Sequence, residues 1–390
     1  MHILFISLTC LFNSYSASLR NYSLVFGLLQ NGHRVDVLTF PCDKNNPRFI
    51  ELSQFDNLNV TFFPLTSSII SKVYTSKSRS FLFNIARFFF SRLSLFEFTP
   101  SSIWKSSFLH TFNASSYDVL ISSSDPKVTH RYGSSLLRFL HPKPFWIQYW
   151  GDPFTNDISS SHLYPRFLLK PIERLFLQDS DLSVFTSPFT NFVQKEQYPS
   201  LSHKFLQLPT PSPTQIIPHL RTKNFKISYH GTYSPSIRNI VPLIEAFSYL
   251  PPTFELEIIG PKISSIVNQF SDSSNISFFD HQQDLVPFIE TTDLLVVILN
   301  LSGTQVPGKL FHYAGINRPI LVCSDGENGL AISKFFEQYS RFHIVDNISS
   351  YIAQSILSIS RDSNSNPCFD NPFEPSEIAS HLLDQVNLIS

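Results

Sequence analysis

The sequence has almost no net charge, few cysteines and no long apolar run, and each of these absences excludes a class of protein. Its 29 basic and 30 acidic residues leave a formal charge of −1, so no overall field attracts nucleic acid. No stretch reaches the roughly 18 uncharged apolar residues of a membrane-spanning helix. The apolar start lacks the cationic residues and cleavage site of a signal peptide. We therefore expect a cytoplasmic protein.

Motifs for metals and dinucleotides are also missing. The four cysteines are scattered, without the spacing of a metal site or a disulfide framework, which fits a reducing compartment; they are Cys10, Cys42, Cys323 and Cys368. No His, Asp or Glu cluster has metal-ligand spacing, so no bound metal is expected. The absence of a G-x-G-x-x-G fingerprint argues against a nicotinamide-dependent dehydrogenase.

The 390 residues, of which 42% are apolar, allow two domains with cores of ordinary size. Short buried strands alternate with helical segments, which is typical of parallel α/β layers. The expected strands span residues 3–7, 35–39, 60–63, 119–122, 145–149, 182–185, 226–230, 255–259, 276–279, 294–299, 320–323 and 343–345. Helices are expected at 17–31 and 241–249, and an amphipathic one after Pro375. The fold class is thus α/β, with two Rossmann-like parallel sheets and ligands at the carboxyl ends of their strands.

A proline-rich segment separates the two halves of this pattern. Three prolines occur within residues 208–214, which excludes regular structure there. The expected organisation is an N-terminal Rossmann-like domain at 1–208, a linker at 209–222, a second Rossmann-like domain at 223–365 and a C-terminal helical segment at 366–390. Two such domains would enclose a cleft.

One short helix is the clearest candidate for a phosphate site. It begins near Gly308 and Lys309 and is followed at once by a buried strand. Free N–H groups and a partial positive charge at a helix start favour an anion, and glycine permits close approach. Lys309 is therefore a candidate diphosphate ligand, the alternative being an ordinary solvated helix residue. A helix would place His312 on a neighbouring side, where it is either a ligand or an ordinary packed or surface histidine.

Three segments together resemble the GT-B glycosyltransferases of the family 4 type. These are the opening residues 1–6 with Arg20 and 31–39, the segment 225–247 and the segment 306–321, and the resemblance covers nearly the whole chain in order. It implies transfer of a sugar from a UDP- or GDP-sugar to a glycan or lipid-linked acceptor in polysaccharide or glycoconjugate synthesis. Retention of configuration and no bound cofactor or metal are also implied.

The same resemblance assigns candidate residues. Those on the donor side are Gly231, Thr232, Arg238, Asp280, His281, Gly308, Lys309 and His312. The resemblance makes 1–208 the acceptor-side domain and 223–365 the donor-binding domain. On the acceptor side the candidates are Ser18 and Arg20, together with Ser124 and Asp152, which stand at the ends of buried strands; for Ser124 a purely structural role is the favoured alternative. Arg238 would stabilise the charge of the leaving nucleotide, although a surface salt bridge is an equal alternative. Asp152 follows a buried strand and could act as a general base, or it could simply start a turn before proline.

Two departures from the family pattern bear on activity. The family commonly has two glutamates eight residues apart across the donor helix, and Thr304 and His312 stand at those positions. A glycine pair after the first strand is also absent. These losses motivate a first alternative, a non-catalytic GT-B-like partner subunit. A second alternative is a sugar-nucleotide epimerase on the same fold, which would need acid and base carboxylates near the sugar.

Two further patterns have competing explanations. Asp179 and Asp181 match the Asp-x-Asp metal motif of the GT-A fold, but they precede a strand instead of following one, so we expect them to end a helix. Residues 57–96 contain no acid, and 81–96 form a strongly apolar run with a narrow polar stripe that includes Arg87. That stripe is typical of an interfacial helix on the inner membrane face, the alternative being a buried helix.

Overall fold

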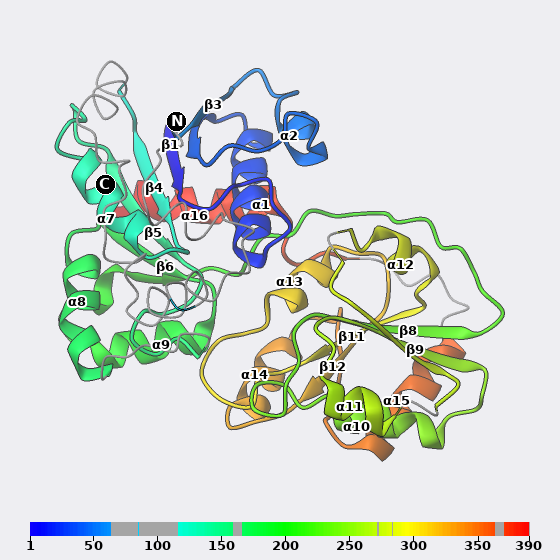
Figure 1. The fold of residues 1–390 in the computed structure, drawn as a ribbon. Helices are drawn as coiled ribbons and strands as arrows, with labels where there is room; N and C mark the ends of the chain where they lie inside the picture. The colour runs from blue at the N-terminus through cyan, green and yellow to red at the C-terminus, as the bar shows by residue number, and fades with distance from the viewer. Residues whose placement is uncertain are drawn as a thin grey trace. The chain divides into compact units, whose positions relative to one another are not determined.

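The computed structural model describes residues 1–63, 85, 116–158, 166–270, 273–282, 284–362 and 370–389 (Figure 1). Contacts divide the chain into two compact units. Unit 1 comprises Met1–Pro209 and Pro375–Ser390, and unit 2 comprises Thr210–Glu374. Each unit has one parallel sheet with its own hydrophobic core, as the sequence pattern predicts.

Unit 1 is built on a seven-stranded sheet in the order β3-β2-β1-β4-β5-β6-β7. Its strands, all parallel, are β1 (His2–Ser7), β2 (Arg34–Thr39), β3 (Leu58–Phe62), β4 (Val119–Ser123), β5 (Phe145–Trp150), β6 (Leu182–Phe185) and β7 (Phe205–Gln207). Strands β1, β2, β4, β5 and β6 are almost wholly buried. This burial explains why apolar residues occur on both faces of these strands, since a parallel sheet that is covered on both sides has no solvent-facing surface.

Helices cover both faces of this sheet. Along β1, Ile3 and Phe5 belong to the core under α1 (Ser16–Gln30) and α16 (Pro375–Ile389), whereas Leu4 and Ile6 belong to the core under α7 (Val128–Leu136). Alternate residues of a strand point to opposite faces, so the two cores lie on opposite sides. Among the described residues of unit 1, the other helical elements are α2 (Pro47–Leu52), α8 (Arg166–Gln178), α9 (Pro188–Gln197) and the 3-10 helix η3 (Pro199–Lys204).

The C-terminal helix belongs to unit 1. Figure 1 shows α16 (red) beside α1 (blue). A Cβ atom on Gly27 would come within 2.1 Å of the Pro375 carbonyl oxygen, so glycine permits this close approach. Asn31, at the end of α1, donates to the Ser376 carbonyl at 2.8 Å and fixes the start of α16.

Unit 2 has a six-stranded parallel sheet in the order β10-β9-β8-β11-β12-β13. The strands are β8 (Phe225–His230), β9 (Phe254–Ile259), β10 (Ile276–Phe279), β11 (Leu294–Ile298), β12 (Ile320–Ser324) and β13 (His343–Asp346). The helices are α10 (Val241–Ala246), the 3-10 helix η4 (Phe247–Tyr249), α11 (Ser264–Gln269), α12 (Val286–Thr291), α13 (Gly308–Ala314), α14 (Gly329–Phe336) and α15 (Ser349–Asp362).

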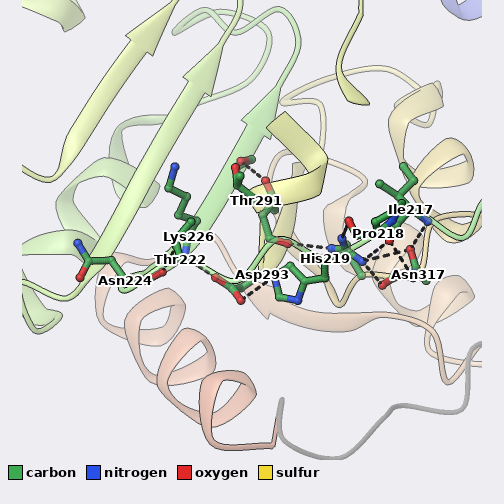
Figure 2. Close-up of polar contacts among 12 residues, drawn as sticks. Ile217, Pro218, His219, Thr222, Asn224, Lys226, Thr291, Asp293 and Asn317 are labelled. Carbon is green, nitrogen blue, oxygen red and sulfur yellow. Dashed lines mark hydrogen bonds and ion pairs between the residues drawn. The ribbon is translucent and has the colours of Figure 1, made fainter. Parts of the chain in front are cut away.

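The segment after Thr210 is irregular, and hydrogen bonds hold it against unit 2. It has no helix, and its contacts run along unit 2 (Figure 2). The buried Arg318 donates to the carbonyl oxygens of Ile217 at 3.2 Å and Pro218 at 2.8 Å. His219 lies 3.1 Å from Asp293, whose other carboxylate oxygen accepts from the Lys226 N–H at 2.7 Å. Segment 210–222 is therefore attached to unit 2 both by these side chains and by backbone hydrogen bonds, such as the one that Gln215 N–H donates to the Gly315 carbonyl at 2.7 Å.

Candidate functional site

The carboxyl edge of the unit 2 sheet is closed by backbone hydrogen bonds between strand ends. Gly231 donates to Ile259 at 2.9 Å, and Gly260 donates to Phe279 at 3.0 Å. Gly231 has φ +134°, and a Cβ on Gly260 would lie 2.2 Å from the Gly231 carbonyl oxygen. Glycine is therefore required at both positions, and the backbone after β8 stays uncovered by side chains.

Lys309 is the second residue of α13, which begins at Gly308 directly after Pro307. Its ammonium lies 5.7 Å from the centre of the Tyr313 ring, one turn further along the helix. Burial, together with the nearby Arg238 guanidinium, lowers the pKa of Lys309 to about 8. The site therefore holds a lysine whose charge is costly without an anionic partner.

Arg238 is held by neutral oxygen atoms. Its Nε donates to Asn300 Oδ1 at 2.8 Å and its Nη1 donates to the Thr232 carbonyl at 3.2 Å. Asn300 is itself fixed by donating to the Gln305 carbonyl at 2.8 Å. Among the residues that the structure describes, neither Arg238 nor Lys309 forms a salt bridge, so two neighbouring cations share no counter-charge.

Two buried side chains beside these cations were not predicted from the sequence. His230 ends β8, and its ring packs edge-on against Tyr313 with centroids 5.8 Å apart. Both ring nitrogens of His230 and the Tyr313 hydroxyl lack a hydrogen-bond partner within the described part of the chain. Burial, followed by the Lys309 charge, lowers the pKa of His230 to about 3, so the ring is neutral. Buried polar atoms of this kind normally have partners.

Sequence position offered two signals for this pair. His230 is the last residue of an apolar strand and is followed by glycine, which is where ligands of parallel sheets bind. Tyr313 stands four residues after Lys309, on the same side of the helix. Neither residue type distinguishes a ligand-facing side chain from an ordinary core residue.

The structure does not group every predicted donor residue with these cations. Asp280 and His281 are exposed after β10, two strands away from β8, and Asp280 pairs with Lys262 at 3.3 Å. Neither has a hydrogen bond or ion pair to Arg238 or Lys309 among the described residues. Thr232 is exposed and contributes its carbonyl to Arg238.

The two positions of the missing glutamates lie on either side of the start of α13. Thr304 is partly exposed in the loop before the helix. His312 is partly exposed on the helix, and its carbonyl accepts from Ser212 Oγ at 3.2 Å. The two residues that the resemblance aligns with the family's glutamates therefore carry a hydroxyl and an imidazole near the start of α13.

The carboxyl edge of the unit 1 sheet has its own polar cluster. The buried Arg20 donates to the Ser124 carbonyl and lies over the Tyr149 ring at 5.4 Å. Ser124 Oγ accepts from the Gly151 N–H at 3.1 Å, and Ser18 Oγ donates to the Cys10 carbonyl at 2.7 Å. Arg20 and Ser124 are thus brought together, whereas Ser18 fixes the loop after β1.

Asp152 is partly exposed and follows Gly151, just beyond the end of β5. A Cβ on Gly151 would lie 1.7 Å from Arg20 Nη1, so only glycine leaves room for the arginine. A second buried cation, Lys127, was not predicted; it pairs with Asp125 and lies 3.6 Å from Asp157. Its role is explained by this ion pairing.

Other predicted features were also located where possible. Asp181 accepts from the Trp146 N–H at 2.8 Å, and Asp179 follows the end of α8. Within the described ranges, no group of three His, Cys, Asp or Glu side chains could hold a metal ion. No described helix has the length and apolar character needed to cross a bilayer. The predicted interfacial segment 81–96 lies outside the described residues apart from Ile85.

Comparison with known proteins identifies the fold. No protein-family model and no curated protein matches the sequence. The structure is similar to HepE of Anabaena, solved with UDP and glucose, at 12% identity over 99% of both chains with a TM-score of 0.61. It is also similar to sucrose-phosphate synthase of Thermosynechococcus elongatus, at 15% identity over 100% of both chains with a TM-score of 0.61.

The chain has the GT-B fold. A glycosyltransferase of Rickettsia africae shares it, at 11% identity over 100% of this chain and 98% of that one, with a TM-score of 0.59. Identities this low establish the GT-B architecture alone, so the activity must be argued from the residues of this chain.

Proposed function

We propose that the protein is a glycosyltransferase that takes a sugar from a nucleotide-sugar donor. The observation that carries this proposal is the pair of uncompensated cations, Lys309 and Arg238, beside the buried polar atoms of His230 and Tyr313. Both cations are only partly exposed, so their charges are better stabilised with a counter-charge, which a diphosphate would supply. The same fold holds UDP in HepE of Anabaena.

In this proposal the two cations stabilise the nucleoside diphosphate as it leaves and gains charge. The N–H groups at Gly308 and the uncovered backbone at Gly231 would contact phosphate oxygens, since glycine permits close approach. His312 would contact the ribose. Asp280, His281 and Thr232 remain proposed contacts to the base and sugar.

The acceptor is proposed to bind unit 1. Asp152 would accept a proton from, or orient, the acceptor hydroxyl, and the Arg20–Ser124 cluster with Ser18 would shape the surface around it. We further propose a family 4-like, retaining and metal-independent hexosyl transfer to a glycan or lipid-linked acceptor in polysaccharide or glycoconjugate synthesis. The setting would be cytoplasmic, with residues 81–96 touching the inner membrane face.

Donor binding is tested by titrating the purified protein with UDP-glucose and GDP-mannose in a calorimeter. One donor should bind, and Lys309→Ala should weaken it by about tenfold or more, the usual effect of losing a charge-assisted hydrogen bond. The matched control is Lys334→Ala, an exposed lysine of α14 in the same unit. Equal affinities for the two variants would remove the diphosphate role of Lys309.

Transfer is tested separately from binding. Asp152→Asn should abolish sugar-dependent nucleotide release with an acceptor extract while leaving the donor dissociation constant unchanged, because Asp152 lies in unit 1. Unaltered turnover would exclude a general-base role for this carboxylate.

A non-catalytic GT-B-like partner subunit is the second candidate, because Thr304 and His312 replace the two family glutamates. It predicts no turnover by the purified protein and activity only when an active transferase is added. A sugar-nucleotide epimerase is the third, and conversion of the donor to its epimer without acceptor would identify it.

A further inference from the structure

Unit 1 contains a cavity that the proposed transfer reaction does not use. It has a volume of about 620 Å³ and lies between α7 and α8 above β5. Its walls include Arg131 and Ser135 of α7, Arg138 in the turn after that helix, Trp146 of β5, and Ile172 and Leu175 of α8. A volume of this size accommodates a drug-sized molecule.

The cavity is distinct from the proposed acceptor region. Trp146 is the second residue of β5, whereas Gly151 and Asp152 follow the carboxyl end of that strand. The Trp146 N–H is bonded to Asp181, which precedes β6, so this tryptophan marks the amino ends of the two strands. The cavity floor therefore lies toward the opposite edge of the sheet.

The walls combine apolar surface with unpaired positive charge. Trp146, Ile172 and the 65% exposed Leu175 offer contact to an apolar body. Arg131 and Arg138 are both exposed, and neither guanidinium has an ion pair or hydrogen bond among the described residues. Asp179 also lines the cavity and opposes them, which leaves one net positive charge there.

A buried histidine adds a polar group to the inner wall. His130 is fully buried, and its Nδ1 lies 2.9 Å from Ser122 Oγ, which also accepts from Trp146 Nε1 at 2.9 Å. The alternative acceptor for the serine hydroxyl, the Ile147 carbonyl, is further away at 3.5 Å. The shorter distance indicates that the Ser122 hydroxyl donates to Nδ1. The neutral ring therefore carries its proton on Nε2. Nε2 has no partner among the described residues, which leaves a buried donor in this wall.

We propose that this cavity binds an anionic amphiphile, a molecule with a single carboxylate or phosphate on an apolar chain. The chain would lie against Trp146, Ile172 and Leu175, and the head group would lie between Arg131 and Arg138. A neutral apolar molecule would leave both arginines unpaired, and a small free anion would leave the apolar walls exposed to water. The combination of the two surfaces selects a molecule that has both parts.

The test is calorimetric titration of the full chain with monomeric decyl phosphate, compared with decanol and with inorganic phosphate. Decyl phosphate should bind at one site and at least about tenfold more tightly than either comparison molecule, since each lacks one of the two interactions. Absence of binding, or equal binding of decanol, overturns the proposal. Binding only to anionic vesicles, with none to the monomer, also overturns it and indicates a membrane surface instead.

Variants locate the binding. The double substitution Arg131→Ala/Arg138→Ala should weaken decyl phosphate by about tenfold or more, and Ser135→Trp should fill the cavity and abolish binding. Leu175→Asp changes an exposed position and keeps the test valid where the tryptophan variant does not fold. The control is Arg221→Ala/Arg361→Ala, two exposed arginines of unit 2. Unchanged affinity in the cavity variants refutes the site, and unchanged donor binding in them separates it from the proposed function.

Discussion

Raising the pH should weaken donor binding through a single group, Lys309. Its pKa of about 8 in the protein alone results from burial and from the adjacent Arg238. A bound diphosphate would stabilise the ammonium and raise that pKa again. Binding strength that depends on the charged lysine is therefore fully present below pH 8 and is lost as the pH rises through 8.

The size of the effect follows from the fraction of charged lysine. With a pKa of about 8, about nine tenths of Lys309 is protonated at pH 7 and about one tenth at pH 9. If the complex keeps the lysine charged throughout, the donor dissociation constant should increase about tenfold between pH 7 and pH 9. This corresponds to about 1.4 kcal/mol of binding free energy.

The assay is calorimetric titration at several pH values between 7 and 9, in buffers with different ionisation enthalpies. Proton uptake on binding should grow as the pH approaches 9, because the lysine then gains its proton from solution. Lys309→Arg is the matched control, since its guanidinium stays charged over this range. The control also corrects for any ionisation of the nucleotide itself.

Two results would refute the reasoning. An unchanged affinity of the unaltered protein between pH 7 and pH 9 would show that Lys309 does not bind the anion. A pH dependence of equal size in Lys309→Arg would place the titrating group elsewhere. Removing the second cause of the shift gives an independent check, because Arg238→Gln should raise the pKa of Lys309 and move the loss of affinity to higher pH.

Two further predictions concern stability. In urea denaturation, Arg318→Ala should lower the free energy of unfolding of unit 2 by about 3 kcal/mol. The substitution leaves the carbonyls of Thr292, Ile217 and Pro218 without their charged donor. The control, Arg221→Ala at an exposed position, should have almost no effect. Gly151→Ala should lower the free energy of unfolding of unit 1 by about 2 kcal/mol, because the new methyl group displaces Arg20. Most of this loss should disappear when Arg20→Ala is already present. An equal loss with and without Arg20 would show that the backbone at Gly151 causes it.

The sheets could be predicted because their strands are covered on both faces. Continuous apolar runs, such as residues 3–6 of β1 and all of β11, are stable only where they are buried on both faces. Every strand expected from the sequence is present within a residue or two of its expected ends. The three-residue β7 was missed because so short a segment has no period. The packing of 210–222 on unit 2 was also missed, since it depends on the distant residues Arg318 and Asn317.

The candidate site was predictable only where backbone chemistry required particular residues. Gly308 and Lys309 stand out because a glycine and a lysine at a helix start have few structural reasons to occur together. His230 and Tyr313 do not stand out, because burial and pairing decide their role and both arise from the folded chain. Arg238 was proposed only through the family resemblance, and its orientation depends on Asn300, which lies 62 residues away.

The charges of the unit 2 site favour binding of a diphosphate but do not by themselves imply catalysis. Lys309 and Arg238 have no neutralising carboxylate among the described residues. Without such a carboxylate the local potential stays positive, which favours a diphosphate whether or not transfer follows. Donor affinity alone therefore cannot distinguish a transferase from a non-catalytic partner. Only turnover that depends on residues of both units, such as Lys309 and Asp152, identifies the enzyme.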